Sequence, residues 1–600
     1  MWWVAGSCAW GVCVGLAVSG LRTSRFERAD LPYWLTAVAM LSLCLLVVLD
    51  PDRGFTFVVD DAYYYLQIAR NTDLSGIVSF DGIHRTNGFH PLWLSMLVVL
   101  HRLSPAGDAA FVTLTQLSAL ILAVGAVAWL RHLLVPLAGP LARAAALLVL
   151  FNPWALSRFW LSGMESAAGI LLVLAFLAGW RDLLGSRSTE LLLRTCLAGG
   201  LACLCRFDLA ILVVPALCFL ARTWLRDRGS AGVKDTVWSL LAGAVAMGLP
   251  VAAWLAWNLA EHGTATTVSS YVKTALSPMT LSERYDNLCL VLPSLKFLVG
   301  IPVLRIVSPL VLAAVAWGAW QLGRNIVPDA ARSTYRLLAA AAAIHYVAAR
   351  GGVAESYSWY YLLETLLAAH LAALAVGHLH RPRPAASPAT VLLRPSCFAK
   401  ASQDRSGCDG QVDHRPSTIF SSPRSADATS TAAATMWTWT RRGAPVLVAA
   451  VVASCAWLTR DMLRDEPGYF VSRAIQREGR AAAEWLNANT PADSVVASWD
   501  AGVLGYFSHR PVINLDGLVN DWEFVEVIRT RRYADYLERE GVDFVANSFF
   551  VLEDGTLWHQ REGMAEVMPQ LRPMYRGNGV PFLGVPVTVA VFRFEPGGLP

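Results

Sequence analysis

The chain has 600 residues, of which 55% are hydrophobic and only 16% are charged. Its mean hydropathy of +0.44 is too high for a protein whose whole surface faces water, so lipid must be the solvent for most of the chain. The formal net charge of +4 is small, and the Lys and Arg residues fall in short clusters between apolar runs, which argues against nucleic-acid binding.

Twelve apolar runs along the chain are candidates for membrane-spanning helices. Several are shorter than the ~20 residues that a perpendicular helix needs to cross a bilayer. The sequence therefore predicts a mainly α fold, a polytopic transmembrane helical bundle of about 12 spans. The runs lie at 2–21, 33–49, 112–130, 141–156, 167–180, 193–205, 207–223, 236–257, 302–322, 335–349, 360–378 and 445–459.

The basic residues predict how this bundle is oriented. Cytoplasmic loops carry an excess of Lys and Arg, and placing all the basic clusters in the cytoplasm gives one self-consistent threading with both termini outside. That threading makes residues 50–110 one long exterior loop, and it requires the short run at 91–103 to be a dip or an interfacial helix. The clusters are Arg22, Arg25 and Arg28; Arg131 and Arg143; Arg181, Arg187 and Arg194; Arg222, Arg226, Arg228 and Lys234; Arg324; and Arg441 with Arg442.

Composition divides the chain further. The two N-terminal spans occupy 1–49, the main bundle 111–378 and a last span 444–465. Residues 379–443 are rich in Pro, Ser, Arg and Ala without helical or strand periodicity, which predicts a disordered cytoplasmic linker. Residues 466–600 have the composition of a soluble domain, and we expect an extracytoplasmic α/β domain there.

Alternating patterns predict the elements of this exterior domain. Strand-like runs lie at 494–498, 511–515, 544–548 and 587–594, and amphipathic helical stretches lie at 471–489 and 524–540.

Two adjacent carboxylates, Asp60 and Asp61, begin a helical pattern in the first exterior loop. Asp61 is suited to cap this helix, and a cap beside a solvated acid is the commoner use of such a pair. The pair also suits catalysis, because one carboxylate can take a proton from an acceptor hydroxyl while the other orients it or holds a divalent cation, for which Asp61 is the candidate ligand. Spacing alone leaves both interpretations open. The apolar stripe of the predicted helix is Ala62, Tyr65, Leu66 and Ala69.

The same loop continues with two histidines and an arginine, His84, Arg85 and His90. Turn chemistry explains the neighbouring Asp-Gly and Asn-Gly pairs, but it does not explain these three side chains together. Either histidine could ligate a metal or contact a phosphate, and a structural role in loop packing is equally compatible with the sequence.

Under the predicted threading, four further polar residues reach the same side of the membrane. Glu165 lies between two spans, and Arg206 with Asp208 interrupts an apolar hairpin, where charged groups are costly enough to suggest a function. Lys273 in the loop at 258–287 or Arg206 could neutralise a phosphate. The alternatives are solvated loop charges at Glu165 and Lys273, and a mutual Arg206–Asp208 salt bridge that holds the turn.

At these motifs the sequence resembles the GT-C superfamily of integral-membrane glycosyltransferases, especially bacterial members related to the protein O-mannosyltransferases and the aminoarabinose transferases. An acidic pair in the first exterior loop is the hallmark of that superfamily, and the likeness extends from about residue 33 to the end of the chain. The motifs that carry it are Asp60–Tyr65, Thr86–Trp93, Gly163–Glu165, Arg206–Asp208, Ser498–Tyr506 and Asn514–Asp521.

The resemblance implies a transferase in a bacterial plasma membrane. It would take a sugar from a polyprenyl-phosphate carrier and pass it, with inversion, to a glycan, lipid or protein acceptor outside the cytoplasm. An Asp of the first-loop motif acts as base or metal ligand in that family, which maps onto Asp60 and Asp61.

Two other classes of function remain open from the sequence. In a transporter or flippase of envelope precursors, Arg206 and Asp208 would form an intramembrane relay or a substrate-binding pair. In a non-catalytic scaffold, the bundle would only anchor an exterior domain that binds glycan or a partner.

Overall fold

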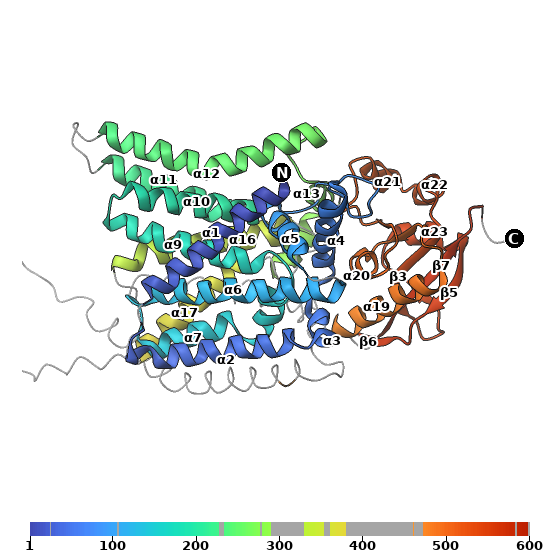
Figure 1. The fold of residues 1–600 in the computed structure, drawn as a ribbon, viewed down its shortest axis with the longest axis horizontal. Coiled ribbons are helices and arrows are strands. Elements are labelled where there is room, and N and C mark those ends of the chain that lie inside the picture. Colours follow the sequence, from blue (N-terminus) through green and yellow to red (C-terminus); the bar gives the residue numbers. More distant parts are fainter. Residues whose placement is uncertain are drawn as a thin grey trace, which may run out of the picture. The chain divides into compact units, whose positions relative to one another are not determined.

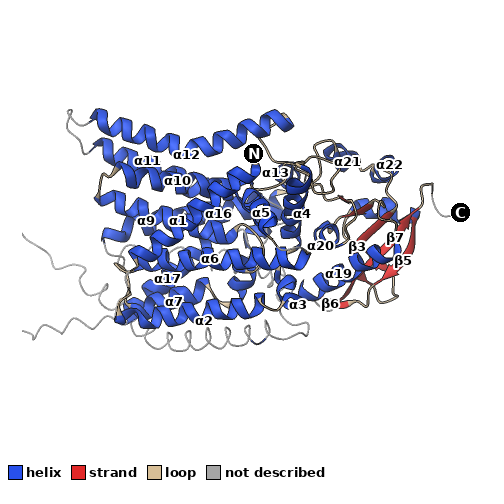
Figure 2. Ribbon diagram, viewed as in Figure 1, coloured by secondary structure: helices blue, strands red, loops and turns tan. Residues whose placement is uncertain are grey.

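The computed structural model of the protein describes residues 1–24, 26–104, 107–226, 233–276, 279–289, 329–352, 361–379, 460, 472–582 and 585–597 (Figure 1). Within these ranges the fold is mostly helical, and the named strands all lie in the C-terminal domain (Figure 2).

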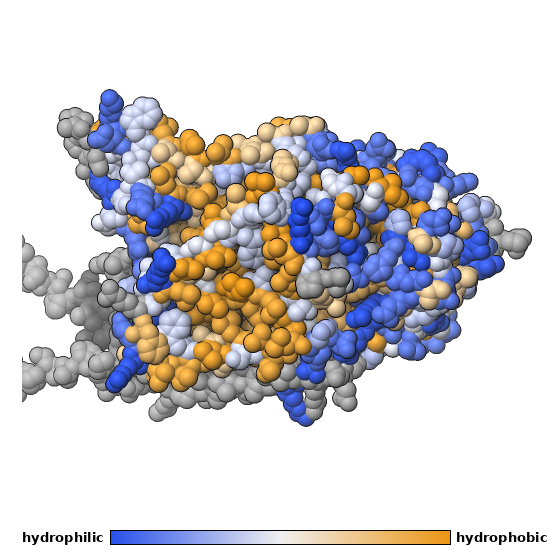
Figure 3. Space-filling model, viewed as in Figure 1, coloured by the Kyte–Doolittle hydropathy of each residue, from blue (hydrophilic) through white to orange (hydrophobic). Residues whose placement is uncertain are grey.

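Six helical segments in the described ranges are long and apolar enough to cross a membrane. The bent pair Pro140–Leu150 and Pro153–Trp160, with 45° between its halves, would be a seventh if it forms one span. Orange, hydrophobic side chains cover much of the helical surface in Figure 3, whereas the C-terminal domain is mostly blue. The six segments are Trp2–Thr23 (α1), Arg28–Val48 (which contains α2, Leu31–Val48), Asp108–Leu134 (α6), Ser166–Gly185 (α9), Phe207–Arg226 (which contains α11, Ala210–Arg226) and Val233–His262 (α12).

These helices confirm that the chain is a membrane protein with a mainly α fold, while the number of about 12 spans stays a prediction. Predicted runs at 193–205, 335–349 and 360–378 fall on α10 (Thr189–Cys205), α16 (Asp329–Gly352) and α17 (Leu362–Leu379), which are helical but are not among the six. The runs at 302–322 and 445–459 and the predicted linker beyond residue 379 lie outside the described residues.

The first loop after α2 folds into two buried helices, α4 (Asp60–Ser75) and α5 (Pro91–Leu103). The prediction that Asp61 caps α4 is wrong, because the helix begins at Asp60, and Val59, two residues before Asp61, occupies the N-cap position. The four residues of the predicted apolar stripe are buried, but burial is not confined to them, since every residue from Ala62 to Ala69 is buried. The reason is that α4 is covered from two sides, by α5 and by α20 (Ala501–Phe507) of the C-terminal domain.

The C-terminal domain is a mixed sheet with flanking helices, as the predicted α/β class requires. Its main strand order is β2-β1-β3-β7-β5, in which β1 is parallel to β2 and β3, while β7 is antiparallel to β3 and β5. Two further strands pair at its margins, β4 with β3 and β6 with β7. The strands are Val496–Ser498 (β1), Val512–Asn514 (β2), Phe544–Val551 (β3), Leu557–Trp558 (β4), Leu571–Arg576 (β5), Val580–Phe582 (β6) and Val585–Phe594 (β7).

Both predicted helical stretches of this domain are helical, although one of them is divided, and the short helices α20 and α23 (Glu562–Val567) were not predicted. The stretch at 471–489 is α19 (Ser472–Asn489), but the stretch at 524–540 is divided into α21 (Phe524–Thr530) and α22 (Tyr533–Arg539). Arg531 lies between them in the left-handed conformation, with φ 57°, and therefore ends the first helix.

Two glycines allow the C-terminal domain to approach the first loop closely. A Cβ on Gly502 of α20 would lie 2.2 Å from the backbone oxygen of Asp60, and one on Gly88 would lie 1.8 Å from that of Leu518. No other residue type fits either contact without movement of the backbone. The glycines thereby set how α20 and the segment at 518–519 meet the loop that contains the acidic pair.

Candidate functional site

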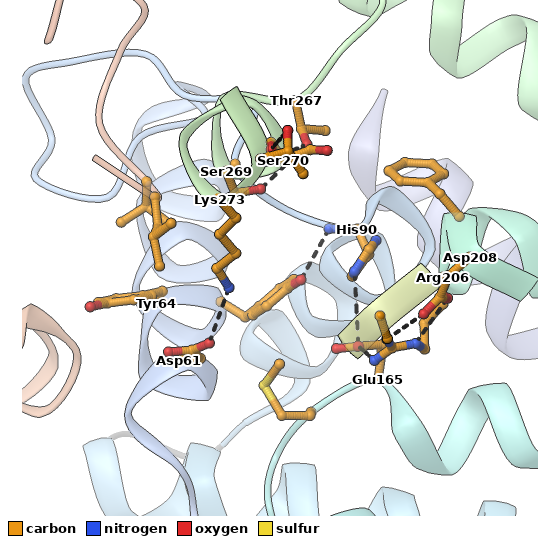
Figure 4. A pocket seen from close by; sticks show the side chains of 18 of the residues that line it. Asp61, Tyr64, His90, Glu165, Arg206, Asp208, Thr267, Ser269, Ser270 and Lys273 are labelled. Carbon is orange, nitrogen blue, oxygen red and sulfur yellow. Dashed lines mark hydrogen bonds and ion pairs between the residues drawn. The ribbon is translucent and has the colours of Figure 1, made fainter. Parts of the chain in front are cut away.

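A cavity of about 300 Å³ lies where the first loop, the helical bundle and the C-terminal domain meet (Figure 4). Its walls come from α4, from the segments that precede α5 and α9, from the break between α10 and α11, and from α13 (Val268–Ala275), α16 and residues 518–519. The charged or polar lining residues include Asp61, His90, Glu165, Arg206, Asp208, Ser269, Ser270, Lys273, Thr274 and His345.

Asp61 and Lys273 face each other across one side of this cavity (Figure 4). The Nζ of Lys273 lies 3.9 Å from Asp61 Oδ2, and both side chains are 20% exposed. Asp61 projects from the first turn of α4, while Lys273 follows Val272, which packs with Val268 against the C-terminal domain. Burial of this apolar side of α13 therefore leaves Lys273 on the side that lines the cavity.

The opposite side of the cavity holds a buried group of charges (Figure 4). Arg206 donates from Nη1 to Glu165 Oε1 at 2.8 Å and from Nη2 to Asp208 Oδ2 at 2.7 Å. His345 extends the group, with Nε2 3.0 Å from Asp208 Oδ2 and Nδ1 2.8 Å from Glu364 Oε1. Buried charges persist only when they are paired, so this network accounts for the polar interruption between two apolar helices.

The Arg206–Asp208 salt bridge that the sequence left open is thus present, and it also lines the cavity. His345 and Glu364 were not predicted as part of it. Each is an ionisable residue in a largely apolar run, a signal that marks costly burial but does not indicate a distant partner.

His90 lies between the buried charges and an aromatic side chain. Its Nε2 is 3.9 Å from Glu165 Oε1, and its ring stacks edge-on to Phe207 with 5.2 Å between ring centres. Burial lowers the pKa of His90, although Glu165 acts in the opposite direction. Among the described residues, neither His90 Nδ1 nor Glu165 Oε2 has a hydrogen-bond partner, although both atoms are buried. Buried polar atoms are normally satisfied, so these two can accept contacts from a ligand in the cavity.

Asp60 does not line the cavity, although it is adjacent to Asp61. Its carboxylate accepts hydrogen bonds from the backbone N–H groups of Gly502, at 3.1 Å, and Val503, at 2.9 Å. Burial, reinforced by the charge of Asp500, raises the pKa of Asp60 to about 7. The side chain thus joins the first loop to α20, while Asp61 alone faces the cavity.

Tyr64 connects the cavity to another buried acid, Asp516. The Tyr64 hydroxyl donates to Asp516 Oδ2 at 3.2 Å, and Asp516 Oδ1 accepts from the backbone N–H of Leu518 at 2.8 Å. Burial raises the pKa of Asp516 to about 7, and Asp61 adds to the rise. In the sequence Asp516 was one of several turn acids, and nothing local distinguished it.

The structure does not bring His84 and Arg85 to the cavity, which corrects their predicted convergence with the other site residues. His84 contacts Asp81 Oδ2 through Nδ1 at 2.7 Å and Glu540 through Nε2 at 3.3 Å. Burial alone would lower the pKa of His84, but Asp81 and other nearby acids raise it to about 9. Arg85 pairs with Glu261. An isolated antiparallel β-bridge between the backbones of Ser79 and Arg85 folds this part of the loop back on itself, away from the cavity.

The described residues do not form a metal site by themselves. No group of three His, Cys, Asp or Glu side chains that could hold an ion occurs in the described ranges. At Asp61 the neighbouring charge is the ammonium of Lys273, which supplies the positive charge that a divalent cation would bring. The cation at Asp61 therefore stays a prediction.

The chain was compared with protein families, curated proteins and solved structures. Residues 470–581 match a protein family described as a domain of unknown function, DUF8728. No curated protein matches the chain. Among solved structures, the chain is similar to ArnT from Cupriavidus metallidurans bound to undecaprenyl phosphate, with 14% identity, coverage of 93% of this chain and 98% of that chain, and a TM-score of 0.48. It is also similar to the same protein in the apo state, with 13% identity, coverage of 93% and 97%, and a TM-score of 0.46.

Proposed function

We propose that the protein is a membrane glycosyltransferase that moves a sugar from a polyprenyl-phosphate carrier to an acceptor outside the cytoplasm, with inversion. The observation that carries the proposal is the set of charges in one cavity. Asp61 lines it together with two cationic side chains, Lys273 and Arg206, while the other two lining carboxylates, Glu165 and Asp208, are paired with Arg206. Asp61 and Arg206 also belong to motifs that resemble the GT-C superfamily.

In the proposed reaction Asp61 is the general base. The acceptor hydroxyl attacks the anomeric carbon of the donor sugar from the side opposite the phosphate, and Asp61 takes the hydroxyl proton. The bond between the anomeric carbon and the phosphate oxygen breaks as the new glycosidic bond forms, so the configuration inverts. The leaving group is the polyprenyl phosphate, which takes the bonding electron pair.

Lys273 and Arg206 are the candidates that stabilise the departing phosphate. Positive groups fixed in a partly buried cavity act where negative charge develops, and they need no reorganisation during the reaction. Arg206 is held in place by Glu165 and Asp208, so its orientation is fixed before the donor binds. His90 and Glu165, each with a buried atom that lacks a partner within the described ranges, suit hydrogen bonds to sugar hydroxyls.

The choice between the two acids of the motif follows from their contacts. Asp60 accepts hydrogen bonds from two backbone N–H groups of α20 and lies outside the cavity. It therefore binds the C-terminal domain and does not contact the acceptor. Asp61 therefore carries the catalytic assignment, and Asp60 is a positioning residue.

The deciding experiment measures transfer of radiolabelled sugar from polyprenyl phosphate in membranes that contain Asp61→Asn. A comparison of envelope glycans between a deletion strain and its parent first identifies the sugar and the acceptor. We expect Asp61→Asn to reduce transfer by at least ~100-fold, the usual scale for loss of a general base. Undiminished transfer would falsify the assignment.

The buried network also favours a second candidate, a transporter. Arg206, Asp208 and His345 form a chain of ionisable groups between apolar helices, as relays in transporters do. Proteoliposomes separate the two functions: substrate-dependent flux without any lipid-linked sugar supports the transporter, whereas sugar transfer without such flux supports the enzyme.

A further inference from the structure

Two adjoining cavities lie apart from the proposed catalytic site. The first is an apolar groove of about 360 Å³ between α1, α5, α10 and α12. Ser95 is its one hydroxyl-bearing lining residue, and it already donates to the backbone oxygen of Leu92. The second cavity, of about 260 Å³, shares Met1, Trp2 and Trp257 with the groove. The shared residues make the two cavities neighbours; we call the pair the channel, and the second cavity its polar mouth.

The polar mouth contains one positive and one negative side chain. Arg85 pairs with Glu261 there, and the two side chains are 62% and 31% exposed, so both can contact a ligand. His262 also lines the mouth, and its buried Nε2 has no hydrogen-bond partner among the described residues. Trp257 joins mouth and groove, with its ring centre 5.1 Å from that of Trp2 and 5.5 Å from that of His262.

We propose that this channel binds a phospholipid with a zwitterionic headgroup, of the phosphatidylethanolamine type. An acyl chain occupies the groove, the phosphate contacts Arg85, and the ammonium contacts Glu261 beside the rings of Trp2 and Trp257. The site is separate from the proposed carrier site, because neither Arg85 nor Glu261 lines that cavity.

Charge complementarity selects this headgroup over others. A purely anionic headgroup would meet Arg85 but would place a second negative charge beside Glu261. An uncharged lipid would cover the Arg85–Glu261 pair without contacting either charge. A phosphate and an ammonium separated by a short linker match the positive charge of Arg85 and the negative charge of Glu261. Aromatic rings also attract an ammonium placed over their faces. The predominantly apolar lining of the groove likewise suits an acyl chain.

The test is lipid retention by the full chain, measured by native mass spectrometry. The protein is extracted into detergent and exchanged into micelles that contain phosphatidylethanolamine and phosphatidylglycerol in equal amounts with the same acyl chains. We expect one phosphatidylethanolamine molecule to be retained in preference to phosphatidylglycerol. Glu261→Gln should remove the preference, and Arg85→Gln should weaken retention of both lipids about ten-fold, the scale of one charge-assisted hydrogen bond.

A matched pair on α12 tests the groove. Ala253 lines it, whereas Ala256 is exposed on the same helix and lines neither cavity. Ala253→Trp should abolish retention and Ala256→Trp should leave it unchanged. Equal retention of the two lipids by the wild type, no retained lipid, a preference for phosphatidylethanolamine that survives Glu261→Gln, or retention that survives Ala253→Trp would each overturn the proposal. Because Glu261→Gln is nearly isosteric, it decides the matter if Ala253→Trp does not fold.

Discussion

The carboxylate of Asp60 accepts a hydrogen bond from the backbone N–H of Val503 at 2.9 Å, between residues 443 positions apart in the chain. The next residue, Asp61, turns instead toward Lys273. One dipeptide therefore supplies both a contact that holds the C-terminal domain and a carboxylate for the cavity. Domain docking and the proposed chemistry are thus coupled through one turn of α4.

Gly502→Ala tests the docking contact. The added Cβ would lie 2.2 Å from the backbone oxygen of Asp60, so α20 must move away from α4. We expect a loss of about 1–3 kcal/mol in stability, the usual cost of overpacking, measured by thermal unfolding in detergent. Gly15→Ala is the control, because nothing lies within 4 Å of the corresponding Cβ on α1. Equal melting temperatures for the two variants would contradict the close approach.

The pKa of Asp60 predicts a pH dependence of stability. Burial raises it from 3.8 to about 7, so between these values the folded protein binds a proton that the unfolded chain has released. The stability that this bound proton contributes to the folded state is fully present below pH about 3.8 and is lost as the pH rises through about 7. Asp60→Asn removes this titration, so the melting temperature of the wild type relative to the variant should fall between about pH 5 and about pH 8. Asp493→Asn, at an exposed position, is the control. A difference that does not change with pH would refute the prediction.

The sequence predicted the classes of structure better than the contacts. Apolar runs and alternating patterns predicted the membrane helices and four of the strands, because burial in lipid or in a sheet is a local property of the sequence. The sequence did not predict β4, β5 or β6. Strands β4 and β6 have two and three residues, too few for a pattern to be visible, and β5 is mostly exposed and therefore shows no alternation.

The site was predicted in part. Asp61, His90, Glu165, Arg206, Asp208 and Lys273 do line one cavity. Asp60 and His84 lie elsewhere, because their partners Val503 and Glu540 come from the C-terminal domain. No local pattern in the first loop specifies contacts to residues more than 400 positions away.

Arg206→Gln should be more damaging than loss of a surface arginine. The change leaves Glu165 and Asp208 without their shared guanidinium, and removing one partner of a buried pair costs about 3–5 kcal/mol. Arg194→Gln is a matched control on α10, because Arg194 pairs with Glu190 at the surface, where such a pair contributes roughly 0–1 kcal/mol. Thermal unfolding of both variants measures the difference. Similar melting temperatures would show that Arg206 does not support the fold.

Lys273→Ala separates phosphate binding by the protein from binding through a metal. If the ammonium of Lys273 meets the donor phosphate, its removal should lower kcat/KM for sugar transfer by about 10- to 100-fold, the scale of one charged contact. Lys234→Ala, at an exposed position near the start of α12, is the control and should transfer sugar at the wild-type rate.

Chelation of divalent cations provides the second measurement. Because the ammonium of Lys273 faces Asp61 and supplies a positive charge there, transfer should persist in a chelator. Activity that requires a divalent cation and is indifferent to Lys273→Ala would assign the phosphate to a metal instead.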